Sequence, residues 1–102
     1  MDQAQKQSRR KGAQRPTREN LVERIRETLL HFGGEAHRRD VIVNVAREIG
    51  VDVKNIPEDL ETQMIISFEE AWRDEARRAL YGFHLRFGEG SHRWGLKLAT
   101  AH

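Results

Sequence analysis

The chain has 102 residues, of which 37% are hydrophobic and 33% charged, with 18 lysines and arginines against 16 acidic residues and no cysteine. We expect one domain from this length. The absence of cysteine excludes a disulfide framework, a thiolate nucleophile and a cysteine zinc site, which favours a cytoplasmic protein. No apolar run approaches the ~18 residues that a membrane span needs, so we expect no membrane partner.

The positive charge is concentrated at the N-terminus. Residues 1–18 hold six basic side chains and one acid, whereas the remainder of the chain is slightly acidic. The first 16 residues are polar and have too little apolar surface to offset their ordering entropy, so we predict a disordered basic arm over 1–16. Such arms often contact the phosphates of nucleic acid, and a solubilising tail is the alternative interpretation.

The first predicted helix follows Pro16. Thr17 can accept a backbone N–H bond as the N-cap residue. Apolar residues then recur at three- and four-residue steps, which predicts one buried stripe: Leu21, Val22, Ile25, Leu29 and Phe32. The pair Gly33-Gly34 predicts the end of this helix, because glycine takes the left-handed conformation that helix C-termini favour.

A short strand and a second helix are predicted next. Residues 35–37 can add a strand to a small sheet, and the helix is expected from Arg38 or Arg39 to Ile49, with Gly50 beyond its end. Residues 51–66 are compatible with helix or loop. Proline is tolerated at the first helical position, so Pro57 favours a turn that starts a short helix.

A long helix is predicted over 67–81. Its apolar face consists of Phe68, Trp72, Ala76, Ala79, Leu80 and Phe83. On the opposite face, Glu69 with Arg73 and Asp74 with Arg78 are spaced as i,i+4 ion pairs.

Residues 84–98 alternate polar and apolar side chains on both sides of a glycine-containing turn, which predicts a β-hairpin. We expect Phe87 to oppose His92, Leu85 to oppose Trp94, and Arg86 to oppose Arg93. The core face would then carry Leu85, Phe87, Trp94, Leu96 and Leu98, and the solvent face His84, Arg86, Arg93 and Lys97. A slip of one residue would exchange the two faces.

This element order is that of a winged helix-turn-helix. We therefore predict an α+β fold of this kind over residues 17–98, with about three main helices, a short strand and a C-terminal β-hairpin wing. Residues 99–102 would form a short C-terminal tail.

Several short motifs, mostly glycines and core positions, are distributed along residues 19–98. They are Phe32-Gly33-Gly34-Glu35-Ala36, Arg38-Arg39-Asp40-Val41-Ile42, Val45-Ala46, Ala76-Arg77-Arg78-Ala79-Leu80 and Gly90-Ser91-His92-Arg93-Trp94-Gly95-Leu96. With these motifs the chain resembles the N-terminal winged-helix domain of Mrr-type restriction-system proteins. It departs from that family at Tyr81-Gly82-Phe83-His84, where the family tends to have a lysine-rich segment.

Fold and resemblance together imply a non-catalytic protein that binds double-stranded DNA, as a transcription regulator or as an accessory of a restriction or mobile-element system. In a helix-turn-helix the later helix enters the major groove, and flanking segments contact phosphate. Guanidinium groups suit phosphate and guanine because they donate two parallel hydrogen bonds. The candidate DNA-binding residues are Arg9, Arg10, Lys11, Arg15, Arg18, Arg38, Arg39, Arg73, Arg77, Arg78, Arg86 and Arg93.

The acidic middle of the chain argues for a different function. Eight acids against two basic residues lie between Asp52 and Glu75, and four of them fall on the helix expected to read the bases. The alternative is a winged-helix module for protein–protein interaction or dimerisation that uses this acidic segment. A homodimer is also compatible with DNA binding, because paired half-sites multiply the contacts of a small domain.

We predict no enzymatic activity, no metal and no cofactor. The tripeptide Asp52-Val53-Lys54 has the spacing of restriction-type nucleases, but it follows a helix-ending glycine and lacks flanking strands. The five histidines show no close ligand spacing. Trp72 and Trp94 are predicted to be core residues, and Tyr81 is a candidate for a contact to the DNA backbone.

Overall fold

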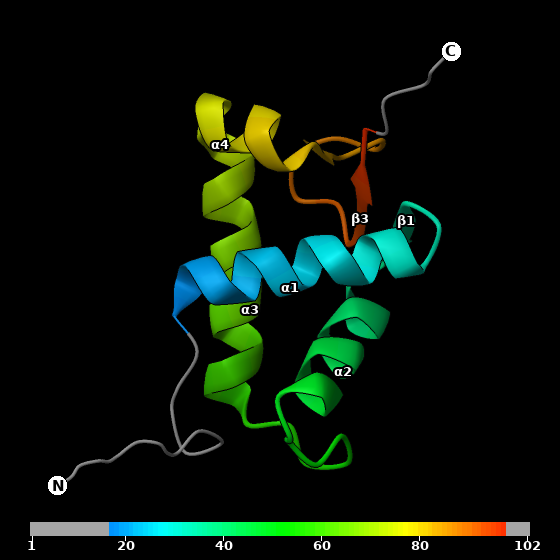
Figure 1. Ribbon diagram of the computed structural model, residues 1–102, viewed down its shortest axis with the longest axis vertical. Helices are drawn as coiled ribbons and strands as arrows, with labels where there is room; N and C mark the ends of the chain where they lie inside the picture. The colour runs from blue at the N-terminus through cyan, green and yellow to red at the C-terminus, as the bar shows by residue number, and fades with distance from the viewer. Residues whose placement is uncertain (1–16, 98–102) are drawn as a thin grey trace, which may run out of the picture.

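The computed structural model describes residues 17–97 and has an α+β architecture of four helices and a three-stranded antiparallel sheet (Figure 1). The elements are α1 (Arg18–His31), β1 (Glu35–His37), α2 (Arg38–Glu48), α3 (Glu58–Arg73), α4 (Glu75–Tyr81), β2 (Phe83–His84) and β3 (Arg93–Leu96). Strand β3 lies between β1 and β2. The predicted arm over 1–16 and the tail over 99–102 lie outside the described residues. Within 17–97 no helix is long and apolar enough to cross a membrane.

The first helix follows the sequence prediction closely. The Thr17 side chain accepts the backbone N–H of Asn20 at 3.1 Å, which confirms the N-cap. The predicted stripe from Leu21 to Leu29 is buried. Phe32 is 41% exposed instead, because the helix ends at His31 and Phe32 is its C-cap.

Helix α2 begins at Arg38, as expected, and residues 49–57 form the connection to α3. Residues 58–66 are helical and belong to α3, which starts directly after Pro57 and runs through Ser67 without a break. Of the segment 51–66, which is compatible with helix or loop in the sequence, residues 51–57 are loop and residues 58–66 are helix. The boundary falls at Pro57 because proline fits the start of a helix and not its interior.

The predicted single helix over 67–81 is wrong, because the chain bends at Asp74. The backbone of Asp74 is extended, with φ −80° and ψ 111°, and its carboxylate accepts the N–H groups of Ala76 at 3.0 Å and Arg77 at 3.2 Å. Aspartate competes for backbone donors in this way and so starts a new helix. The continuous apolar stripe is lost, and Leu80 on α4 is 73% exposed.

The offset predicted for the hairpin is confirmed. Phe83 faces Leu96 and His84 faces Gly95 in the β2–β3 ladder, which is the same offset as the predicted pairs. The ladder ends at His84, and Phe87 in the β2–β3 loop (residues 85–92) is 66% exposed instead of buried. The predicted core position of Phe87 is therefore wrong, because no strand continues far enough to hold it against the sheet.

An aromatic stack joins α3 to the sheet. The rings of Phe68 and Trp94 lie parallel with centroids 4.1 Å apart, and Phe83 packs 4.7 Å from Phe68. Phe68 and Trp94 are fully buried, which confirms Trp94 as a core residue, while Trp72 is partly buried and packs against this core. Because the stack uses one side of β3, Arg93 points to the other side of the sheet and is exposed.

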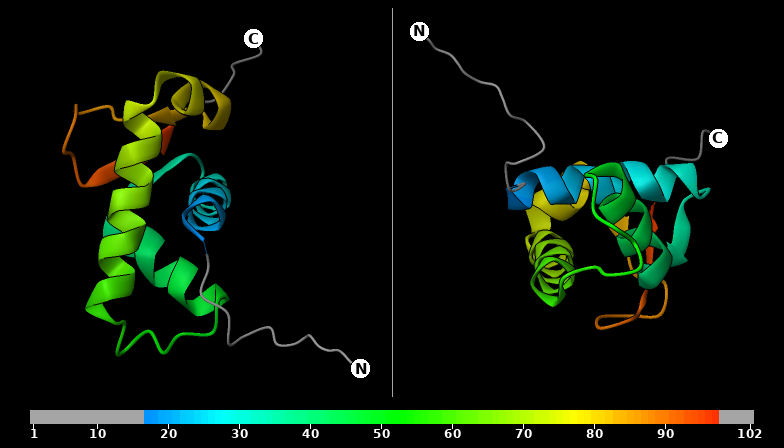
Figure 2. Two further views of the ribbon diagram at one scale, coloured as in Figure 1. Left: turned by 90° about the vertical axis from the view of Figure 1, so that its left-hand side faces the viewer. Right: turned by 90° about the horizontal axis from the view of Figure 1, so that it is seen from below.

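The β2–β3 loop lies on the side of the molecule away from α1. Both views in Figure 2 place α1 and this loop, drawn in orange, on opposite faces. The start of α2 lies beside the base of the loop, since the backbone N–H of Arg38 donates to the carbonyl of His92 at 2.6 Å. The loop and the start of α2 thus form one continuous surface.

Candidate nucleic-acid interface

Six basic residues lie on neighbouring segments: the end of β1, the first turn of α2, the β2–β3 loop and the start of β3. His37 faces Arg93 across the β1–β3 ladder, and the rings of His37 and His92 lie edge to face with centroids 5.9 Å apart. We call this surface the basic corner, made of His37, Arg38, Arg39, Arg86, His92 and Arg93.

A single carboxylate holds two arginines of the basic corner together. Oε1 of Glu35 lies 3.2 Å from Nη2 of Arg86 and 3.6 Å from Nε of Arg93. The two arginine side chains remain 58% and 46% exposed. Their predicted position on the solvent face of the hairpin is confirmed, and one negative charge offsets only half of their combined positive charge.

The first turn of α2 adds two more arginines. His37 is the N-cap residue, and its Nδ1 accepts the backbone N–H of Arg39 at 3.0 Å. The Arg39 guanidinium makes a long ion pair of 3.8 Å with Glu61 of α3. The ring of His37 therefore caps α2 and also lies against the ring of His92.

The three candidate arginines between residues 70 and 80 do not form a common surface. Arg73 donates to Glu89 of the β2–β3 loop at 3.0 Å, and Arg77 to Glu19 of α1 at 2.9 Å. The guanidinium of Arg78 lies over the Trp72 ring, 5.1 Å from its centroid. The predicted i,i+4 pairs on this segment are therefore wrong, because Arg73 pairs with Glu89 instead of Glu69 and the Asp74 carboxylate caps α4 instead of pairing with Arg78.

The other candidate residues lie toward the N-terminus. Arg18 opens α1, and its Nη1 is 2.9 Å from both carboxylate oxygens of Glu70. The remaining four candidates, Arg9, Arg10, Lys11 and Arg15, lie outside the described residues. Their role in a basic arm stays a prediction.

These ion pairs leave the arginines free to exchange partners. The arginine side chains that form them at the basic corner are about half exposed, and their partners Glu35 and Glu61 are partly exposed. Ion pairs that water reaches contribute ~0–1 kcal/mol each. A phosphate oxygen can replace such a carboxylate at little cost, since both are anionic acceptors that match the guanidinium fork.

Helix α3 has the opposite charge. It carries five acids, Glu58, Asp59, Glu61, Glu69 and Glu70, and Arg73 is its one basic residue. Glu58, Asp59 and Glu70 are exposed. The domain thus presents an acidic helix and, at the base of the hairpin, a basic corner.

Tyr81 is tied to α1. Its hydroxyl donates to the Glu19 carboxylate, which also accepts from Arg77. The hydrogen bond to Glu19 raises the pKa of Tyr81 to about 12, with burial and the charges of Glu19 and Glu23 adding to the effect and Arg77 opposing it. Tyr81 therefore links α4 to α1, and its contact to a DNA backbone stays a prediction.

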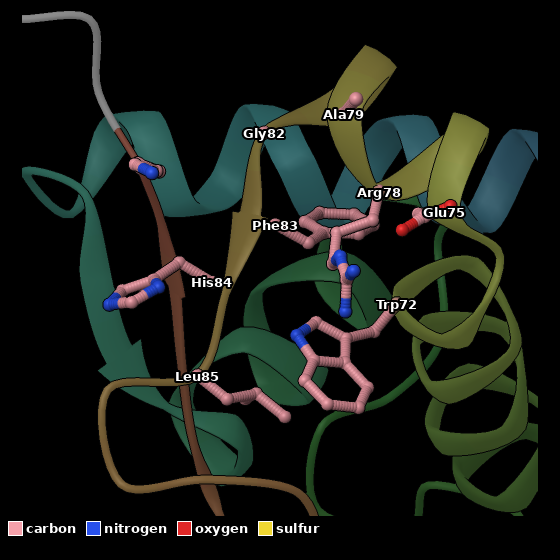
Figure 3. Close-up of a pocket in the computed structure, with 9 residues that line it drawn as sticks. Trp72, Glu75, Arg78, Ala79, Gly82, Phe83, His84 and Leu85 are labelled. Carbon is pink, nitrogen blue, oxygen red and sulfur yellow. The ribbon is translucent and has the colours of Figure 1, made fainter.

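An open groove of about 520 Å³ separates α3 and α4 from β2 (Figure 3). Trp72 and Leu85 line it from opposite sides, and Arg78 lies against the indole. Glu75 and Lys97 add one charge of each sign. The groove is therefore partly apolar and weakly charged, unlike the basic corner.

The described residues contain no group of three or more histidine or acidic side chains that could hold a metal ion. Asp52, the acid of the nuclease-like tripeptide, caps a turn: its carboxylate accepts from the backbone N–H of Lys54 at 3.0 Å and from the side chain of Asn55 at 3.3 Å. Such turns are an ordinary use of aspartate.

Comparison of the chain with protein-family models, with curated proteins and with solved structures finds no match. The resemblance to the Mrr-type domain stays a prediction, and we infer function from geometry and charge. Sequence reasoning missed His37, His92 and Glu35 as parts of the site. The one available signal was the position of His37 directly before a predicted helix, where N-cap residues occur.

Proposed function

We propose that this chain is a non-catalytic winged-helix protein that binds duplex DNA through its basic corner. The element order and the strand order β1-β3-β2 support the winged-helix interpretation. In a helix-turn-helix protein, segments that flank the recognition helix contact the phosphates, and the hairpin and the start of α2 are such segments here. The proposal needs no cofactor, because it involves binding alone.

The observation that carries the proposal is the convergence of Arg86 and Arg93 on Glu35 beside the start of α2. The basic corner has four arginines, while Glu35 and Glu61 are the acids that pair with them. The corner keeps a net positive charge even when both histidines are neutral. A basic surface of this kind is the electrostatic feature by which proteins neutralise the phosphates of a duplex.

The acids of α3 change how the duplex would lie. A helix with five acids and one arginine repels phosphate, so its insertion into the major groove is unfavourable. We expect the duplex to contact the hairpin and the first turn of α2, with α3 turned away from the phosphates. The arm over 1–16 would add affinity without adding sequence specificity.

Fluorescence anisotropy of a labelled mixed-sequence duplex tests the proposal. The full chain should bind at ~50 mM salt and lose affinity linearly on a logarithmic scale as salt is raised. Absence of binding at the lowest salt concentration would contradict DNA binding.

A protein partner is the second candidate function. It is favoured by the exposed acids of α3 together with the exposed Leu80 and the groove beside Trp72. A basic partner would suit α3, because opposite charges steer association. This candidate gains support if duplex binding is absent and the full chain self-associates or binds a basic peptide in sedimentation experiments.

A further inference from the structure

Phe87 is the aromatic side chain with the greatest exposure in the described part of the chain. It is 66% exposed and lies in the β2–β3 loop. Two turns shape this loop: the N–H of Gly88 donates to Leu85 at 3.0 Å, and the N–H of Ser91 donates to Gly88 at 3.1 Å. Exposing a phenylalanine ring forfeits the stabilisation that burial would give, so the loop presents Phe87 without benefit to the core.

The loop is held on both sides of Phe87. The guanidinium of Arg86 lies over the Phe87 ring, 4.9 Å from its centroid, and Glu89 pairs with Arg73 of α3 at 3.0 Å. Arg86 is in turn paired with Glu35. The ring is therefore tethered through its neighbours to both the sheet and α3, which lowers the entropy lost when it binds a ligand.

The surroundings of Phe87 favour nucleic acid as that ligand. Arg86 belongs to the basic corner, which also contains His92 and Arg93 near the other end of the loop. Phosphates bound at the basic corner would bring bases close to the ring. An aromatic ring beside arginines is the combination that proteins use to stack on bases while holding the backbone.

The balance between the free energy of stacking and the cost of separating bases decides which kind of base the Phe87 ring can bind. Stacking an aromatic side chain on a base contributes ~1–3 kcal/mol, and separating an intact base step costs a similar amount. The two terms nearly cancel in a fully paired duplex. An unpaired base costs much less to displace, so stacking there gives a net gain.

We infer that Phe87 stacks on an unpaired or poorly stacked nucleobase, so that the chain prefers a duplex with such a defect to a fully paired one. This inference rests on the proposed DNA binding and names the base-contacting residue of that same surface. Arg86 and Arg93 supply the phosphate contacts that paired and defective duplexes share. Phe87 supplies the difference between them.

Two duplexes of equal length and charge test the inference with the full chain. One is fully paired, and the other carries a single unpaired 2-aminopurine. Wild type should bind the second about tenfold more tightly and change its 2-aminopurine fluorescence. Phe87→Ala should bind both duplexes equally, with the affinity of wild type for the paired one, and leave the fluorescence unchanged. Leu30→Ala is the matched control, because Leu30 is also an exposed hydrophobic residue but lies on α1, and it should behave as wild type.

The outcomes separate the two proposals. If wild type binds both duplexes equally, or if Phe87→Ala keeps the preference, the stacking role is wrong while DNA binding stands. If wild type binds neither duplex at ~50 mM salt, the proposed function itself fails. A change in self-association of Phe87→Ala without any duplex preference in wild type would assign the ring to a protein contact and overturn the inference.

Discussion

His37 and His92 meet edge to face, with ring centroids 5.9 Å apart, at the point where β1, β3 and α2 join. The two histidine side chains have different structural roles. His37 accepts the backbone N–H of Arg39 through Nδ1 and so caps α2. No such acceptor role is found for His92 within residues 17–97, although its carbonyl accepts from Arg38.

Replacing His37 by alanine should therefore destabilise the domain through the cap. Loss of an N-cap side chain costs about 1 kcal/mol in the free energy of unfolding, which urea denaturation followed by circular dichroism can measure. His37→Asn should restore most of the stability, since asparagine is a strong N-cap residue. His92→Ala removes the same ring contact without the cap, so equal losses in both alanine variants would contradict the capping role.

The double substitution Arg86→Ala/Arg93→Ala should weaken duplex binding. If each arginine contacts one phosphate, the slope of log affinity against log salt should become shallower by about 2. Anisotropy titrations at several salt concentrations give both quantities. Arg24→Ala is the control, because Arg24 forms an ion pair of similar exposure with Glu48 but lies on α1, away from the β2–β3 loop (Figure 2). An unchanged slope in the double variant would exclude the hairpin arginines from the interface.

Glu35→Gln should strengthen duplex binding. The substitution removes the negative charge that pairs with Arg86 and Arg93 and keeps the shape of the side chain. Since each such exposed pair contributes only ~0–1 kcal/mol, we expect a modest loss of stability and a gain of several-fold in affinity at low salt. Weaker binding with normal stability would instead mean that Glu35 is needed to position the two arginines.

Tyr81 is the single tyrosine of the chain, so its titration can be followed directly by the near-ultraviolet absorbance of phenolate. The hydrogen bond to Glu19 raises its pKa to about 12 in the folded chain, against ~10 when unfolded. The folded state holds this proton more tightly, so its contribution to stability is complete below about pH 10 and is lost as the pH rises toward 12.

Glu19→Gln should bring the folded-state pKa of Tyr81 back toward the ordinary value, because an amide accepts the hydrogen bond without a negative charge. Glu27→Gln, on the same helix, should leave it unchanged. A titration midpoint that does not move in Glu19→Gln would contradict the assigned cause.

Local patterns were sufficient for the first half of the fold and for the hairpin offset. Thr17 and Gly33 mark the two ends of α1, and the period of the apolar residues between them identifies its buried side. The offset of β2 against β3 follows from strict alternation around a glycine turn, since a slip would bury charged side chains.

The same kind of pattern failed at Asp74 and Phe87. The apolar period of the sequence places Asp74 in the middle of a helix, but its carboxylate accepts two backbone N–H groups and starts α4. Phe87 alternates correctly with Leu85, yet the ladder stops at His84 and the ring stays in solvent. Periodicity reports the secondary-structure preferences of neighbouring residues, and it does not show where tertiary contacts end a helix or strand.

The sequence by itself determined how much charge the chain carries, where the first two helices lie and how the hairpin is aligned. These properties depend on composition and on residues a few positions apart. Only the tertiary structure decided which arginines share a surface: β1 pairing with β3 places His37 opposite Arg93 and lets Glu35 pair with both Arg86 and Arg93, while Arg73, Arg77 and Arg78 have unrelated partners. Long, flexible side chains choose partners by distance in space, and that distance exists only once the sheet has formed.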